Sequence, residues 1–263
     1  MTDSSFASDG HGSAGGGKLS AYDAFPDLLT VHHRDEGCRF GHISYVNRTN
    51  PLGPALQDVL LKNYARYAFD YTRDLRGAKV DVAGLFARKD NPLHVEIGFG
   101  KGDSTFQDAL ENPDVNFFCF DVYLQGFASL MSKISGAGLN NILLCHYDAL
   151  DFISRSMTES CVSRFKIFFP DPWPKRKHNK RRLINAQTAE LFASKLIAGG
   201  VIHAATDIKG YAEKIMQAFS SSSALENVYD GYAPKGIRKN LTSYERKAIS
   251  EGREIFDIIF KKI

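Results

Sequence analysis

The sequence predicts an α/β fold built on a doubly wound, mostly parallel β-sheet with helices on both faces. Short apolar runs alternate with helix-like patterns between residues 92 and 206, and this alternation is typical of parallel strands joined by crossover helices. Three of the runs, at 93–97, 117–120 and 165–169, consist mainly of apolar residues, as expected of strands that are covered on both faces. The 263 residues suffice for one large domain or two small ones.

The expected elements follow one another along the chain. Apolar residues recur at helical spacing from 55 to 71, which predicts a helix ahead of the sheet. Gly199-Gly200 is expected to cap a later helix over 183–196 at its C-terminus. The other expected elements are strand 93–97, helix 104–110, strand 117–120, helix 127–135, strand 141–146, strand 165–169, strand 201–205, a helix through Tyr211 and Phe219, and paired terminal strands at 226–232 and 255–260.

The composition excludes several classes of protein. No run of about 18 apolar residues occurs, so no membrane-spanning helix is expected, and the N-terminus lacks the pattern of a secretory signal. The four cysteines share no close spacing, which favours reduced thiols over disulfides or a zinc site. The formal net charge is only +3, so an argument for nucleic-acid binding must come from local clusters. We expect a cytoplasmic protein with no membrane partner and no bound metal.

A glycine-rich segment follows the first expected strand. Glycines such as Gly98 and Gly100 allow a sharp turn and a close approach of the backbone to a ligand. Lys101 is not followed by Ser or Thr, as a phosphate-binding loop requires, and Asp103 stands where a dinucleotide fingerprint has its third glycine. Glu96 would repel a pyrophosphate. The pattern favours a ligand with a cationic part, such as S-adenosylmethionine, over a tight turn without a ligand.

Acidic residues follow several of the expected strands. Asp121 comes directly after the second strand, where a carboxylate can accept hydrogen bonds from ribose hydroxyls. Asp148 and Ala149 follow the third strand, in position to meet an adenine, and Asp171 and Asp207 follow the fourth and fifth. Helix capping would explain any one of these acids. Together they predict a nucleoside cofactor at the carboxyl edge of the sheet, where open α/β sheets bind their ligands.

A proline-rich string and a basic run lie after the fourth expected strand. The prolines in 168–174 fix the backbone and place Asp171 and Trp173, the single tryptophan, at the edge of the sheet. Residues 175–182 then carry six cations in eight positions and no acid. Such a run is commonly a solvated face, but its position beside the candidate site favours contacts with a phosphate backbone.

These strings resemble the tRNA (guanine-N7-)-methyltransferase family. The likeness rests on 96–102, 168–173, 178–182, 205–207 and a C-terminal motif over 242–257, in the right order and spacing. An Asp-Pro-Trp string followed by a basic run is not a general methyltransferase feature. The resemblance implies a seven-stranded Rossmann-like methyltransferase sheet, S-adenosylmethionine as cofactor, and methyl transfer to N7 of a guanosine in the tRNA variable loop.

The resemblance also implies roles for individual residues. Family members often have Glu at the position of Asp121, and the shorter acid should still reach a ribose. The implied cofactor contacts, with Gly100 and Ala149 added from the patterns above, are Glu96, Gly98, Gly100, Asp121, Asp148, Ala149 and Asp171. The implied substrate contacts are Lys175, Asp207, Thr242 and Glu245.

Asp171 is the catalytic candidate. Guanine N7 presents a lone pair and carries no proton, so methyl transfer needs alignment and the exclusion of water but no general base. The carboxylate of Asp171 could stabilise the cationic methylguanine or orient the base through its amino edge, and both roles stay open. Trp173 is either a stacking partner for the base or a core residue.

The sequence patterns divide the chain into three parts and leave other functions open. Residues 1–20, in which ten positions are Gly or Ser, are expected to be a disordered tail. Residues 21–90 are an N-terminal extension with a helix that can contact tRNA, and 91–263 are the methyltransferase domain. A partner subunit is not expected. The alternatives are a non-catalytic RNA-binding protein and another class I methyltransferase of the same fold.

Overall fold

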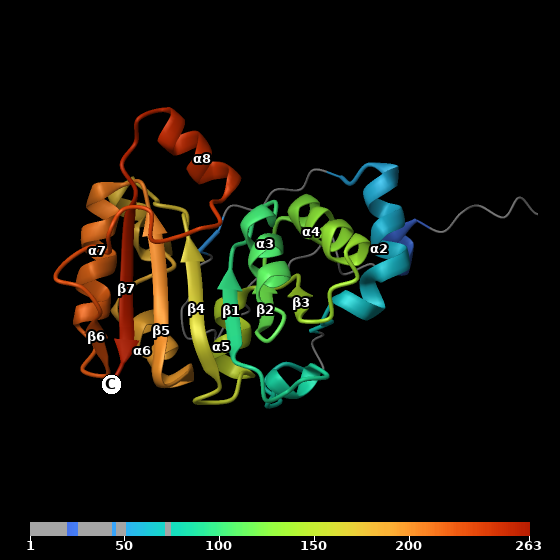
Figure 1. The fold of residues 1–263 in the computed structure, drawn as a ribbon, viewed down its shortest axis with the longest axis horizontal. Coiled ribbons are helices and arrows are strands. Elements are labelled where there is room, and N and C mark those ends of the chain that lie inside the picture. The colour runs from blue at the N-terminus through green and yellow to red at the C-terminus, as the bar shows by residue number, and fades with distance from the viewer. Residues whose placement is uncertain (1–19, 26–43, 46–50, 72–74) are drawn as a thin grey trace, which may run out of the picture.

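The computed structural model describes residues 20–25, 44–45, 51–71 and 75–263. Its centre is a seven-stranded sheet with the order β3-β2-β1-β4-β5-β7-β6 (Figure 1). The strands β1 to β5 pair in parallel, and β7 runs antiparallel to both β5 and β6. The predicted mostly parallel, seven-stranded sheet is therefore confirmed, whereas the predicted tail lies, except for Ser20, outside the described residues. The strands are β1 (Leu93–Ile97), β2 (Asn116–Phe120), β3 (Ile142–Cys145), β4 (Val162–Phe168), β5 (Leu196–Thr206), β6 (Leu225–Asn227) and β7 (Phe256–Lys262).

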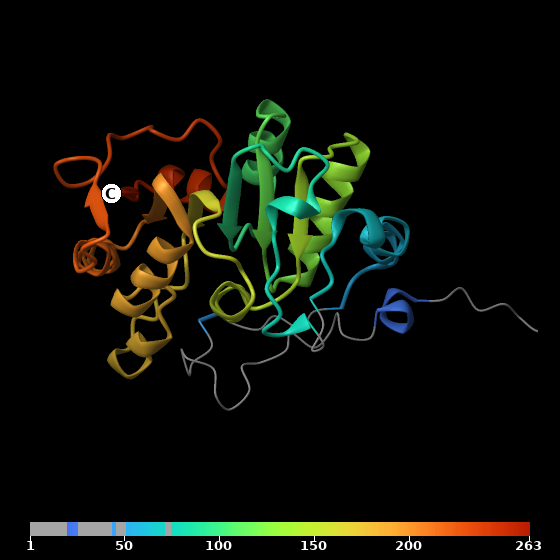
Figure 2. The same cartoon turned by 90° about the horizontal axis from the view of Figure 1, so that it is seen from below.

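Helices cover both faces of the sheet. Figures 1 and 2 show α3 and α4 on one face and α5, α6 and α7 on the other, while α2 packs on α4 beyond the β3 edge. No helix in the described ranges is both long enough and apolar enough to cross a membrane. The helices are α1 (Ala21–Ala24), α2 (Pro54–Tyr67), α3 (Asp103–Glu111), α4 (Leu124–Gly136), α5 (Ala149–Arg155), α6 (Ala186–Lys195), α7 (Lys209–Ser220) and α8 (Ser243–Ser250), with short 3₁₀ turns η3 (Ala83–Leu85) and η4 (Arg176–Arg181).

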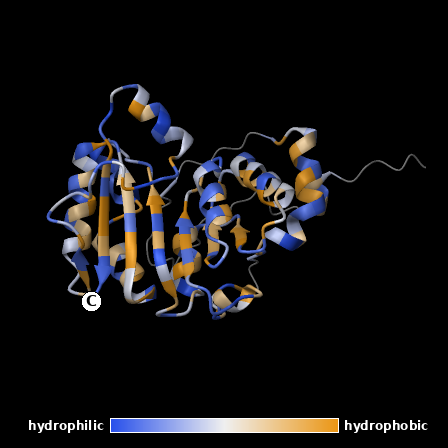
Figure 3. Cartoon of the chain, in the orientation of Figure 1, coloured by the Kyte–Doolittle hydropathy of each residue, from blue (hydrophilic) through white to orange (hydrophobic). Residues whose placement is uncertain are grey.

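The central strands are apolar because both of their faces are buried. Side chains along β2 alternate between two hydrophobic clusters, with Phe118 and Phe120 in one and Phe117 and Cys119 in the other. All five residues of β2 are buried, and hydrophobic colour is concentrated on the strands in Figure 3. A sheet covered on both sides in this way leaves its ends as the exposed part.

Several boundaries differ from the sequence predictions. The helix expected over 183–196 begins only after its N-cap Asn185 and ends at Lys195. The predicted C-cap at Gly199-Gly200 is wrong, because β5 already begins at Leu196 and contains both glycines. Helices α5 and α8 were not expected at all, and β6 is shorter than the predicted strand over 226–232.

Candidate active site

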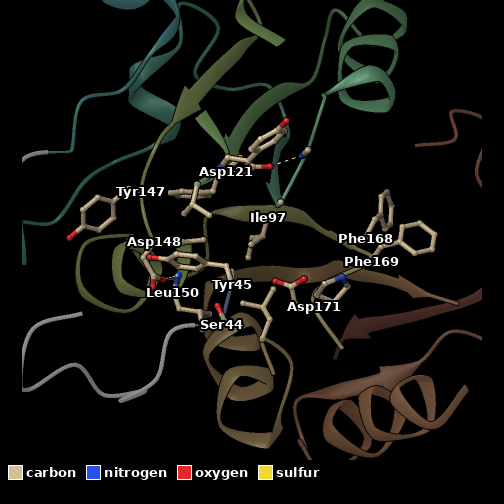
Figure 4. Close-up of a pocket in the computed structure, with 18 residues that line it drawn as sticks. Ser44, Tyr45, Ile97, Asp121, Tyr147, Asp148, Leu150, Phe168, Phe169 and Asp171 are labelled. Atoms are coloured by element: carbon tan, nitrogen blue, oxygen red, sulfur yellow. Dashed lines mark hydrogen bonds between the residues drawn. The ribbon is translucent and has the colours of Figure 1, made fainter. Parts of the chain in front are cut away.

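A cavity of about 210 Å³ opens at the carboxyl edge of β1, β2, β3 and β4 (Figure 4). Most of the residues that line it end these strands or follow them within a few positions, as expected for ligand sites of open α/β sheets. Most of the predicted cofactor residues line this cavity, namely Gly98, Gly100, Asp121, Asp148, Ala149 and Asp171.

The glycine loop forms one wall of the cavity. Gly98 and Gly100 adopt φ values of 82° and 58°, a region that side chains rarely enter. A Cβ added to either residue would meet nothing within 4 Å, so both face open space. The loop is also packed from behind, since a Cβ on Gly126 of α4 would lie 2.0 Å from the carbonyl oxygen of Gly100. The loop therefore exposes bare backbone to the cavity and is supported by α4.

Asp121 is fixed by backbone donors. Its carboxylate accepts hydrogen bonds from the amides of Gly100 at 2.6 Å and Tyr123 at 2.7 Å. Burial nevertheless raises the pKa of Asp121 to about 6, because removal from water disfavours the charged form more than the amides favour it. A ligand that offers hydroxyl donors to this carboxylate would favour its ionised form.

Asp148 begins a helix as well as lining the cavity. Its side chain accepts hydrogen bonds from the amides of Leu150 and Asp151, as the N-cap of α5. Ala149 and Leu150 add apolar surface to the wall, and Tyr147 is fixed there by a hydrogen bond from its hydroxyl to Asp151 at 3.1 Å. This wall suits a flat, largely apolar ring with a few polar atoms.

The structure does not bring Glu96 into the cavity. Its carboxylate accepts a hydrogen bond from Lys166 Nζ at 2.9 Å, and Lys166 also contacts Asp108 at 2.5 Å. The Glu96 and Lys166 side chains are 3% and 6% exposed. Although burial alone would lower it, the two carboxylates raise the pKa of Lys166 above its ordinary value. The assignment of Glu96 as a cofactor contact stays a prediction.

Asp171 lies in a loop whose backbone is strained on both sides. Phe169 and Trp173 have φ values of 51° and 41°, which are unusual for bulky residues. The Phe169 amide still donates to the carbonyl of Ala205 at 2.8 Å, and Trp173 Nε1 donates to the carbonyl of Ser44 at 3.1 Å. Strained backbone that its surroundings hold in place is characteristic of functional sites.

The basic run divides into two groups. Arg181 stacks over the Trp173 ring at 4.8 Å, and Arg182 donates from Nε to the carbonyl of Pro172 at 2.9 Å. These two arginines support the loop that carries Asp171. The other four cations are exposed and form no ion pair within the described part of the chain. They are Lys175, Arg176, Lys177 and Lys180.

The remaining predicted substrate residues lie at the same end of the sheet but do not line the cavity. Asp207 pairs with Arg253, and the Thr242 hydroxyl caps α8 by accepting from the amide of Glu245 at 3.0 Å. Glu245 is 4% exposed and forms a bidentate pair with Arg238 at 2.5 and 2.6 Å. Their roles toward a substrate stay predictions.

Some residues of the cavity were missed in the sequence. Tyr123 and Tyr147 sit next to the strand-end acids, and this position is a signal that could have identified them. Ser44 and Tyr45 also line the cavity, but no pattern in the sequence points to them. Within the described residues, no three His, Cys, Asp or Glu side chains gather closely enough to hold a metal ion.

The donor set fits S-adenosylmethionine. The open backbone at Gly98 and Gly100 gives room for the amino-acid part, Asp121 offers a carboxylate for ribose hydroxyls, and the wall at Ala149 and Leu150 is apolar enough for adenine. The fit needs no basic side chain, in agreement with a ligand that has no phosphate.

Comparisons with known proteins give a consistent result. A family model described as "Putative methyltransferase" matches residues 90–258. The tRNA (guanine-N(7)-)-methyltransferase of Francisella philomiragia is 35% identical over 220 residues, which cover 84% of this chain and 94% of the relative. The enzyme of the same name from Nitrosospira multiformis is 36% identical, with 83% and 93% covered. That from Paracidovorax citrulli is 33% identical, with 95% and 93% covered.

Solved structures resemble this chain in fold. The crystal structure of the 16S rRNA methyltransferase KamB superposes with a TM-score of 0.50 and covers 74% of this chain and 95% of its own. The sequence identity is only 13%, so this likeness bears on the fold alone.

Proposed function

The chain belongs to the tRNA (guanine-N(7)-)-methyltransferase family, and on this premise we propose that it transfers a methyl group from S-adenosylmethionine to N7 of a guanosine in the variable loop of tRNA. The observation that carries the proposal is the meeting of Gly98, Asp121 and Asp171 on one cavity at the carboxyl edge of the sheet. Because its substrate would be tRNA, we expect the enzyme to act in the cytoplasm.

The residues around the cavity have separate tasks in binding the cofactor. Gly98 and Gly100 admit it close to the backbone, Asp121 accepts hydrogen bonds from the ribose, and the wall at Ala149 holds the adenine. When bound, S-adenosylmethionine supplies an electrophilic methyl group on a sulfonium. We also assign Asp148 to this wall, where it fixes the first turn of α5.

Asp171 acts on the base and not on a proton. Guanine N7 has a free lone pair, so the protein has to align N7 with the methyl group and keep water away. The strained loop between Phe169 and Trp173 gives Asp171 a fixed position at the rim of the cavity. From there its carboxylate can bind the amino edge of guanine or stabilise the positive charge that develops on the base.

The four exposed cations of the basic run would bind the RNA backbone. Lys175, Arg176, Lys177 and Lys180 are free of ion pairs within the described residues, so their charge is available to phosphates. They adjoin Asp171 in the sequence, and a tRNA bound to them would bring its loop to the cavity. Thr242, Glu245 and Asp207 would then contact the tRNA where α8 and the end of β5 meet it, at the same edge of the sheet.

A methyl-transfer assay tests the proposal. The purified chain alone is incubated with methyl-labelled S-adenosylmethionine and either unmodified tRNA or total cell protein. We expect label in tRNA without any second subunit, at a site that becomes sensitive to the borohydride and aniline cleavage specific for 7-methylguanosine. Label in protein, label at another atom, or tRNA binding without transfer would each overturn the proposal. Label in protein or at another atom would indicate another methyltransferase, and tRNA binding without transfer would indicate a non-catalytic RNA-binding protein.

A further inference from the structure

Tyr244, in the first turn of α8, is an unusually exposed aromatic residue. It is 48% exposed, and it is the only Phe, Tyr or Trp in the described part of the chain that is exposed to this degree. Exposed aromatic surface beside a binding cavity is available to a flat ligand.

The ring lies beside a residue that lines the cavity. Its centroid is 5.1 Å from that of Phe169, which lines the cavity two residues before Asp171 (Figure 4). The Tyr244 hydroxyl reaches Asp207, at the end of β5, at 3.3 Å. Helix α8 lies above the ends of β4 and β5 (Figure 1), and the ring contacts one residue that follows each strand, Phe169 and Asp207.

Arg253 holds the ring in position. Its Nη1 donates to the Tyr244 hydroxyl at 3.0 Å, and its guanidinium carbon lies 5.2 Å from the ring centroid. Arg253 also pairs with Asp207, so three side chains fix one another. A ring that is fixed before binding loses little conformational entropy when a base stacks on it.

Trp173, the other aromatic candidate, is already engaged. Arg181 lies 4.8 Å from its ring centroid, His178 approaches its ring at 5.8 Å in an edge-on arrangement, and Nε1 donates to the Ser44 carbonyl. These contacts give Trp173 a structural role in the loop that carries Asp171. Trp173 is also only half-buried whereas Tyr244 is exposed, and this difference favours Tyr244 as the surface for the base.

We propose that the target guanine stacks on the ring of Tyr244. The inference rests on the proposed function. Base–aromatic stacking is strong and tolerant of sequence, and RNA bases read by proteins are commonly unstacked and placed on aromatic rings. A stacked guanine would have its edge directed to Asp171 and its N7 toward the cavity. The methylated base is a cation, so the ring would attract the product as well.

Two variants of Tyr244 and one of Ile249 test the proposal through kinetics. With saturating cofactor, Tyr244→Leu should lower kcat/KM for tRNA roughly 5- to 150-fold, the range of a lost stacking contact. Tyr244→Phe keeps the ring and should stay within about threefold of the parent enzyme. Ile249→Ala, at an exposed position of the same helix, is the matched control and should change nothing. Cofactor affinity and melting temperature should hold for all three.

Photo-crosslinking tests the contact without any variant. A tRNA with 6-thioguanosine at the target position is bound to the parent protein and irradiated, and the crosslinked peptide is identified by mass spectrometry. We expect a crosslink at Tyr244. A crosslink at Trp173 with none on α8, or a Tyr244→Leu enzyme as active as the parent, would overturn the inference while the proposed function stands. A parent enzyme that transfers no methyl group to tRNA would overturn both.

Discussion

Lys166 Nζ lies 2.9 Å from Glu96 Oε2 in the interior of the protein, and this pair joins β4 to β1 below the glycine loop. Asp108 of α3 contacts the same ammonium and accepts a hydrogen bond from Asn240 at 2.7 Å. The segment before α8 is thus tied to the helix that follows the glycine loop.

Replacing Lys166 with Met should destabilise the fold. The change leaves the carboxylates of Glu96 and Asp108 without their cation, and breaking a buried pair in this way costs about 3–5 kcal/mol. Urea denaturation measures the loss. Lys62→Met, which breaks an exposed pair with Asp58, is the control, and equal losses for both variants would contradict the account.

Cofactor affinity should depend on the ionisation of Asp121. Burial raises the pKa of this carboxyl to about 6, and ribose hydroxyls donate best to the ionised form. The affinity for S-adenosylmethionine should therefore be constant above pH 7 and fall below pH 6, approaching tenfold per pH unit. Titration calorimetry between pH 5 and 8 measures it. Asp121→Asn should weaken binding and remove this dependence, whereas exposed Asp114→Asn should leave it intact. A flat profile for the parent protein would count against Asp121 as a ribose ligand.

The two groups of cations in the basic run should respond differently to substitution. Lys177→Ala and Lys180→Ala should each weaken tRNA binding and lower the slope of log Kd against log salt by about 1. Arg182→Ala should instead reduce kcat, because Arg182 supports the Pro172 carbonyl next to Asp171. Lys247→Ala, which removes a cation that faces Glu251 at 3.8 Å, is the control and should not lower the slope. Equal salt slopes for all the variants would mean that the run is only a solvated surface.

Substitutions of Asp171 should separate its two possible roles. Asp171→Ala should lower kcat strongly with little effect on tRNA binding, since it removes a group that acts in the transition state. Asp171→Asn keeps an acceptor without the charge. Activity near that of Ala would identify charge stabilisation, and partial recovery would identify orientation of the base. Single-turnover rates should vary little between roughly pH 6.5 and 9. A rate that rises tenfold per pH unit would mean that Asp171 or another group removes a proton.

Much of the fold was predictable because its strands are buried on both faces. The apolar runs at β1, β2 and β4 are visible without any structure, and the acids that follow them identify the edge where the cavity lies. Helices α5 and α8 were missed although both begin with a recognisable cap. For Asp148 a ligand role was favoured over helix capping, and Thr242 stands three positions before Glu245, the spacing of a capping box.

Other features depend on contacts between distant parts of the chain. Lys166 meets Asp108 across 58 positions of sequence, and no local pattern shows that this lysine is buried. The same holds for Ser44, whose carbonyl accepts from Trp173 across 129 positions. Leu183 and Ile184 extended the hydrophobic pattern of α6 beyond its true start because both are buried ahead of the helix.

Exchange of one atom in the substrate tests the central claim most directly. Two tRNAs are compared that differ only at the target position, one with guanosine and the other with 7-deazaguanosine, which has a carbon in place of N7. With methyl-labelled S-adenosylmethionine and the purified chain, the account predicts that the guanosine tRNA is methylated and that the 7-deaza tRNA binds equally well but receives no label. Methylation of both tRNAs would show that the enzyme acts on a different atom.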